Sequence, residues 1–418
     1  MNTLTFAASA ALDGPDWFAQ FRRSGAEAFA AATRPSSEQE IWRYSRIGEL
    51  DLDGFGPPGA AEASLPATVD TTLADLAGLA VVQNGRVIRC ELSPELAARG
   101  VKFASAVELD HAEAYVGQVI GRSDDALAVA NDAYGSDPLL LVVPRGVTVD
   151  RPIMVVDWVS AGGAAVFSRL VVQADAGSAV TVLHQQRSDD QNCWIAPVVE
   201  LHAARDARVG YMVLQDLGVA SWQTATVVAE AHQQSTIDVV AAAFGGHYAR
   251  LRLDLRLVGR GASGNLAALY FADGSQMFDF RTLQDHQAPD CRSDLLFKGV
   301  VDGQSHSVYS GMIHVRPEAR GTNALQTNRN IKLSDAAWAD SVPNLQIENS
   351  DVRCSHASTV GPIDQEQRFY LESRGVPTRR AEQLIVGGFF DDVATRLPHD
   401  ELRAQIAALV GTKLGVAS

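Results

Sequence analysis

Apolar and polar residues follow different periods in three parts of the chain, 1–137, 138–350 and 351–418. In the first part, the large apolar residues of "PDWFAQFRRSGAEAFAAA" recur roughly at helical period, which predicts helix across residues 15–47. Within that stretch, Ser36 or Ser37 could cap a second helical section. Residues 105–120 again show a helical pattern.

Two further signals complete the first part of the chain. A stretch rich in Pro, Gly and Ala from Gly54 to Thr68 predicts a linker. The segment "GLAVVQNGRVIRCELS" predicts two strands joined at Asn84-Gly85, a dipeptide typical of tight hairpin turns. We therefore expect residues 1–137 to be a mostly helical α/β region with a linker and a β-hairpin.

Residues 138–350 consist of short β-rich runs such as "AVTVLHQQ", in which apolar and polar residues alternate. Two sets of turn signals recur in steps of 28 to 30 residues. A solenoid keeps its turns in step because every coil travels the same perimeter, so the pattern predicts a parallel β-helix. A β-sandwich with long hairpins is the alternative. The turns centre on Ala176-Gly177, Arg205-Asp206, Gln234, Ala262, Asp290 and Gly321, and on Asp190, Gly218, Gly246, Gly274 and Gly303.

The last part of the chain predicts three helices. "PIDQEQRFYLESRG" starts near Asp364 and stops at Gly375, and "VPTRRAEQLIVGGFFDDVATRL" and "PHDELRAQIAALVG" follow. Leu384, Ile385 and Phe389 lie on the apolar stripe of the second helix. This stripe is either core or a docking face, and a short helical unit offers few partners to cover it. We expect a docking face for a partner protein.

Charge, cysteine spacing and missing motifs disfavour several classes of function. The net charge of -15 disfavours binding to nucleic acid or to an anionic membrane surface. The four cysteines are scattered, which suits a reducing compartment, and no basic residue precedes Arg22 as a signal peptide would require. These features predict a cytoplasmic protein. The chain also lacks the phosphate-binding sequence G-x-x-x-x-G-K-[ST], so we expect no nucleotide site of its own.

The segment "DVRCSHASTVG" carries the most distinctive chemistry. Cys354 and His356 are two residues apart on an expected strand, so both side chains project from the same face. Two ligands do not complete a tetrahedral metal site or a cluster, which need four. The simpler interpretation is a structural Cys and a hydrogen-bonded His. For His286, Cys291, His306 and His314 we expect hydrogen bonding within the fold.

The run from Tyr309 to Val393 resembles the SufB/SufD family of iron–sulfur cluster assembly proteins. The matching stretches include "YSGMIHVRPEARGTNALQTNRNIKLSD", "PNLQIENSDVRCSHASTVGPIDQEQRFYLESRG" and "AEQLIVGGFF". "EIWRYSRI" and "NDAYGSDPLLLVVPRGV" also look like family segments, and the form "DVRCSHASTVG" is similar to SufD.

This resemblance implies a mainly β fold, a right-handed parallel β-helix between an N-terminal α/β region and a C-terminal helical region. It implies a non-catalytic scaffold that pairs with a SufB-like subunit, docks a SufC-like ATPase, and receives sulfur from a cysteine desulfurase. Cys354 and His356 would lie at the subunit interface where a transient iron–sulfur cluster is proposed to form. The helices after residue 361 would bind the ATPase.

Other functions stay open at this point. The chain could be a SufB-like or homodimeric scaffold, and whether a flavin binds is not given by the sequence. A carbohydrate-acting β-helix enzyme is a third possibility, but it would need a row of carboxylates on one face and usually secretion.

Overall fold

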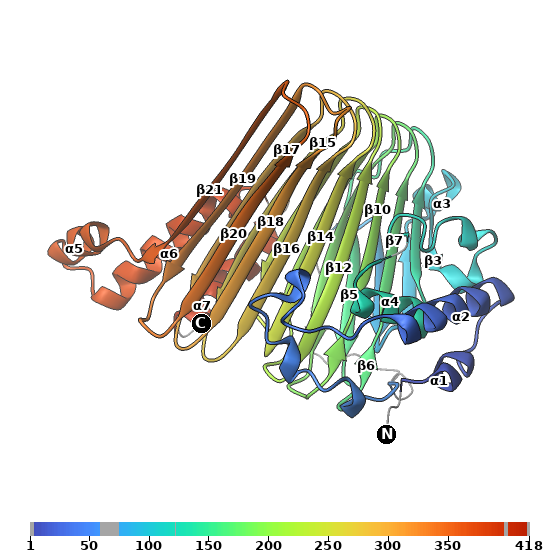
Figure 1. Cartoon of the computed structure of the whole chain (residues 1–418), viewed down its shortest axis with the longest axis horizontal. Helices are drawn as coiled ribbons and strands as arrows, with labels where there is room; N and C mark the ends of the chain where they lie inside the picture. The colour runs from blue at the N-terminus through green and yellow to red at the C-terminus, as the bar shows by residue number, and fades with distance from the viewer. Residues whose placement is uncertain (1–3, 59–74, 122, 397–399, 416–418) are drawn as a thin grey trace.

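The computed structural model describes residues 4–58, 75–121, 123–396 and 400–415. Two sheets face each other and form a parallel β-solenoid of about eight turns, with helices near both ends of the chain (Figure 1). The expected mainly β fold and parallel β-helix are therefore confirmed, and the β-sandwich of antiparallel hairpins is wrong. Only β1–β2 and β3–β4 pair antiparallel among the named strands.

Successive coils contribute strands to the two sheets alternately. In spatial order, the first sheet contains β2 (Arg86–Leu92), β1 (Gly78–Gln83), β5 (Ile153–Val159), β8 (Ala179–Ser188), β11 (Arg208–Asp216), β13 (Thr236–Ala243), β15 (Ser263–Ala272), β17 (Arg292–Val301), β19 (Thr322–Lys332) and β21 (Val352–Pro362). The second contains β20 (Trp338–Ile347), β18 (His306–Val315), β16 (Met277–His286), β14 (Tyr248–Leu257), β12 (Trp222–Ala231), β10 (Val198–Ala203), β7 (Arg169–Ala174), β4 (Leu139–Val143) and β3 (Lys102–Ser105). The short strands β6 (Ala165–Val166) and β9 (Trp194–Ile195) adjoin the second sheet.

The turn positions expected from the sequence recur once in every coil. Gly177, Asp206 and Gln234 have φ values of 71°, 62° and 56°, the left-handed conformation that lets a chain reverse sharply. Each of these residues donates its backbone N–H to the matching turn of the next coil, at 2.9, 2.9 and 3.1 Å. The nearly constant number of residues per coil therefore stacks the turns on one another as well as the strands. The Asn84-Gly85 hairpin is confirmed in the same way, with φ values of 50° and 79°.

Most of the N-terminal region packs on the outer face of the second sheet, but Leu96 of its third helix joins the core inside the solenoid. Its helices are α1 (Phe6–Ala10), α2 (Asp16–Ala31), α3 (Pro94–Ala98) and α4 (Ala126–Tyr134). The prediction of helix across residues 15–47 is wrong after Ala31, where only the single 3-10 turns η1 (Glu40–Trp42), η2 (Ile47–Glu49) and η3 (Leu52–Gly54) follow. Residues 105–120 likewise contain only η4 (Ala106–Glu108) and η5 (Ala112–Ala114). Most of the expected linker lies outside the described residues.

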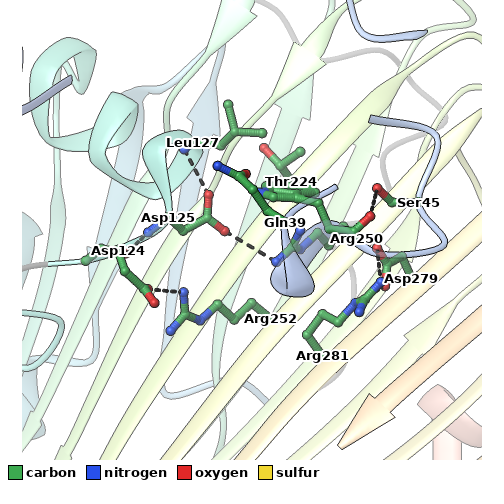
Figure 2. A network of polar contacts seen from close by, with 12 residues as sticks. Gln39, Ser45, Asp124, Asp125, Leu127, Thr224, Arg250, Arg252, Asp279 and Arg281 are labelled. Atoms are coloured by element: carbon green, nitrogen blue, oxygen red, sulfur yellow. Dashed lines mark hydrogen bonds and ion pairs between the residues drawn. The ribbon is translucent and has the colours of Figure 1, made fainter. Parts of the chain in front are cut away.

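Tertiary contacts account for the missing second helix. Trp42 is buried against the sheet, and the guanidinium of Arg250 lies 3.4 Å from the centre of its ring. Arg250 also pairs with Asp125, which caps α4 by accepting from the backbone N–H of Leu127 (Figure 2). These contacts hold the segment around Trp42 against the face of the sheet, so it does not form the expected second helix.

Of the three C-terminal helices, the second and third lie on the outer face of the first sheet, whereas the first projects beyond the end of the solenoid and packs against the second (Figure 1). They are α5 (Gln365–Ser373), α6 (Thr378–Ala394) and α7 (Asp400–Lys413). Val386, Phe390 and Val393 of α6 are buried in one apolar cluster with outward side chains of the sheet. The expectation that this unit lacks local partners is therefore wrong. Within the described part of the chain, no helix is long and apolar enough to cross a membrane.

Candidate metal-ligand pair at the terminal coil

Strands β20 and β21, which we call the terminal coil, are the last strands of the two sheets. Each pairs with one neighbouring strand, β18 and β19 respectively, and most of β21 is exposed. Trp338 and Ile347 of β20 and Val360 of β21 are exposed apolar residues. Edge strands of this length normally require a cover or a partner because their backbone groups can pair with another chain.

Cys354 and His356 both lie on β21. In the unbroken register with β19, Cys354 is opposite Ala324 and His356 is opposite Gln326. Cys354 is half-buried and packs against the apolar cluster that includes Ile313 on the inner side of the solenoid. His356 follows on the same side of the strand and is exposed.

The thiol of Cys354 is held in its protonated form. Burial raises its pKa, and a hydrogen bond from the backbone of Ala324 offsets part of this effect. A soft metal ion binds thiolate, so binding at Cys354 would release a proton. Among the residues that the structure describes, no third His, Cys, Asp or Glu joins Cys354 and His356 in a group close enough to hold one ion. This chain therefore supplies at most two such ligands here.

Polar side chains line the interior beside this pair. Gln326, directly beneath His356 in the register, is buried, and neither atom of its amide has a hydrogen-bond partner in the structure. Next along the strand, Ser358 donates to Ser341 at 2.7 Å, and Ser341 donates to Asn328 at 2.8 Å. An unpaired buried amide is costly, so Gln326 has hydrogen-bonding capacity available to a group arriving at His356.

Comparison with known proteins assigns the family. Residues 158–389, from β5 into α6, match the model of the SufBD core domain of the SUF system for FeS cluster assembly. The chain belongs to the SufBD family. Membership agrees with the resemblance carried by "DVRCSHASTVG", since Cys354 and His356 lie within the matched range.

Relatives of the SufBD family match across most of the chain. An iron–sulfur cluster assembly SufBD family protein of Mycobacterium bovis is 31% identical over 398 residues, covering 91% of this chain and 90% of its own length. A chloroplastic SufBD family protein of Arabidopsis thaliana is 25% identical, covering 96% of this chain and 77% of its own. A Staphylococcus epidermidis member is 24% identical, with 92% and 86% covered.

A groove runs between α5, α6 and the end of the first sheet. It has a volume of about 920 Å³, and Leu384, Ile385 and Phe389 line it together with Tyr370 and Leu371 of α5. Leu384 is 45% exposed. The three residues expected to dock a partner thus border one groove in this SufBD protein, which Asp364, Glu366 and Gln367 also line, although the buried face of α6 is a different one.

The remaining expected residues are hydrogen-bonded within the SufBD fold. Burial lowers the pKa of His286 to about 4, so this imidazole is neutral at physiological pH. The expectation of hydrogen bonding is confirmed for all four side chains. None of them joins Cys354 and His356, which we call the terminal pair. The contacts are His286 with Ser293 (2.8 Å), Cys291 with the Gly259 carbonyl (3.3 Å), His306 with Asp340 (2.7 Å) and His314 with Glu348 (3.2 Å).

One further cluster, formed by His202, Glu230 and His232, lies on the second sheet and was not predicted from the sequence. The two histidines are 30 residues apart. That spacing equals one step of the turn pattern and is the signal that could have brought them together from sequence alone.

Proposed function

We propose that this SufBD family member is a SufD-like scaffold subunit, without catalysis of its own, on which a nascent iron–sulfur cluster is assembled as cargo. The observation that carries the proposal is the exposed terminal coil, where an accessible imidazole and a thiol lie on one face of an edge strand. Its partner is a SufB-like subunit that pairs with this coil.

The ligand count supports a shared site. Iron in a cluster is held by thiolates, or by imidazoles in some clusters, and each cluster takes four protein ligands. Cys354 and His356 supply two, so a second chain at the same edge would complete the set. Gln326 would donate to or accept from the arriving group and hold it beside His356.

The second partner is a SufC-like ATPase, which docks at the groove lined by Leu384, Ile385 and Phe389. A helix-lined groove of this size, with apolar and acidic side chains along it, suits an amphipathic helix of another protein. ATP hydrolysis would then act on the scaffold from α5 and α6, which are joined directly to β21. Sulfur would reach the complex from a cysteine desulfurase system. The four free cysteines support a cytoplasmic location.

A homodimeric or SufB-like scaffold is the second candidate. Two copies that meet at their terminal coils would bring together two Cys354 and two His356 side chains, the four ligands that a cluster needs. The exposed residues Trp338 and Val360 would be covered in either assembly.

Purification from the native host tests the proposal. The tagged full-length chain is isolated without oxygen, its partners are identified by mass spectrometry, and iron and sulfide are measured per complex. We expect a SufB-like subunit and an ATPase to co-purify, and His356→Ala to reduce iron and sulfide while both partners remain bound. Recovery of the chain alone as a cluster-loaded dimer would favour the second candidate. Full loading of the His356→Ala complex would exclude this residue as a ligand.

A further inference from the structure

The outer face of the second sheet brings two histidines and a glutamate together. In the pairing of β10 with β12, His202 is directly opposite Glu230, and His232 follows Glu230 by two residues on the same side. The Nε2 atom of His232 lies 3.1 Å from Nε2 of His202 and 2.8 Å from Oε1 of Glu230. The three ligand atoms all lie within 4.8 Å of one another.

One proton cannot satisfy both contacts of the His232 Nε2 atom. If this nitrogen carries a proton, it donates to Glu230 and cannot accept a hydrogen bond from His202. If it carries none, its lone pair faces the carboxylate oxygen at 2.8 Å, which is repulsive. A cation between the three atoms would interact favourably with every lone pair.

The surroundings favour a cation. The side chains of His232 and Glu230 are 40% and 25% exposed, which gives an ion access from solvent. Arg256, beside Glu230 on β14, donates instead to the carbonyl of Val119 at 2.7 Å.

We propose that His202, Glu230 and His232 form a binding site for a divalent transition-metal ion of the Zn²⁺ or Fe²⁺ class. Two imidazoles and one carboxylate suit these ions, whereas Mg²⁺ and Ca²⁺ prefer oxygen ligands. Bonds of about 2.0–2.1 Å in tetrahedral geometry separate two ligand atoms by roughly 3.3 Å, close to the 3.1 Å between the two imidazole nitrogens. Three ligands leave one position for water or for a donor from another molecule.

Metal titration of the full-length chain tests the site. The chain carries Cys354→Ser and His356→Ala so that the terminal pair cannot contribute, and it is first treated with EDTA. Zn²⁺ affinity is measured by competition with a chromophoric chelator, and the Co²⁺ complex is examined by absorption spectroscopy. We expect one Zn²⁺ per chain, a Co²⁺ spectrum without a thiolate charge-transfer band, and a higher melting temperature with Zn²⁺.

His202→Gln and His232→Gln are the test variants, each made in the same background. Loss of a partner to a metal ligand costs 10–100-fold in affinity, so loss of a ligand itself should weaken Zn²⁺ binding by at least about 100-fold. His111→Asn is the matched control, because His111 is an exposed histidine near Glu113. Melting curves without metal establish that each variant is folded.

Equal Zn²⁺ affinity in the parent chain and both folded histidine variants would overturn the proposal. So would the absence of saturable Zn²⁺ binding in the parent chain, or a thiolate band in its Co²⁺ spectrum. None of these results depends on cluster assembly or on either partner, so the metal site and the scaffold function are tested separately.

Discussion

Substitutions on α6 should separate partner docking from folding. Leu384 is 45% exposed in the free chain, so Leu384→Ala should change the free energy of unfolding by no more than about 0.5 kcal/mol. Full burial of a leucine side chain is worth about 1.5–3 kcal/mol, and a partner would cover roughly half of it. Loss of about 1 kcal/mol corresponds to roughly fivefold weaker ATPase binding.

Leu384→Glu should have a larger effect on the same interface. An unpaired carboxylate in an apolar contact costs several kcal/mol, so the affinity for the ATPase should fall by about 100-fold or more. Phe390→Ala is the reciprocal control. Phe390 is 4% exposed in the cluster beneath α6, and its removal should cost about 3–5 kcal/mol of stability.

The assay measures two quantities on each purified variant, the melting temperature and the affinity for the ATPase subunit. Point substitution is preferable to removing residues 362–418, because α6 and α7 cover apolar side chains of the solenoid that truncation would expose. Wild-type affinity of a folded Leu384→Glu chain would refute docking at this groove.

Three further predictions concern the solenoid. His356→Ala should change the free energy of unfolding by less than about 0.5 kcal/mol yet reduce cluster loading, and loading that falls only in step with melting would assign His356 a structural role. The lowered pKa of His286, about 4, means that the unfolded chain takes up a proton first as pH falls. The associated stability is complete above about pH 6.5 and is lost towards pH 4, so urea titrations should show wild type losing about 3 kcal/mol more than His286→Gln in that window. Gly299→Ala should lower stability by about 1–3 kcal/mol in thermal melts, because the new Cβ would lie 2.1 Å from the Tyr270 ring, and an unchanged melting temperature would contradict this packing.

The solenoid could be predicted from the sequence because its turns carry a local signal. Gly and Asp are residue types that favour turns, so positions such as Gly177 and Asp206 stand out in the sequence, and their regular repetition indicates the length of a coil. The N-terminal segment after Ala31 could not be predicted in this way. Its helical pattern was overridden by Trp42, whose burial under Arg250 depends on a strand more than two hundred residues later.

The candidate site was predictable only in part. The spacing of Cys354 and His356 was enough to place both side chains on one face of a strand. Finding Gln326 beneath His356 requires the register between coils, which is set by the perimeter of the whole solenoid. On α6, the sequence placed Leu384 on the apolar stripe but could not say which apolar residues face the sheet, because the adjacent strands decide that Phe390 is buried and Leu384 is exposed.

The two ends of the solenoid differ in a way that limits how many copies can join. At one end, β3 is four residues long and β2 carries the exposed ion pair of Arg89 and Glu91, features that discourage pairing with another strand. At the other end, β20 and β21 offer long edges of ten and eleven residues. A solenoid with only one end open to strand pairing can form a pair with another solenoid, but it cannot build a longer stack. Pairing through the terminal coil would therefore stop at two solenoids, and it would leave the groove beside α6 free for a different partner.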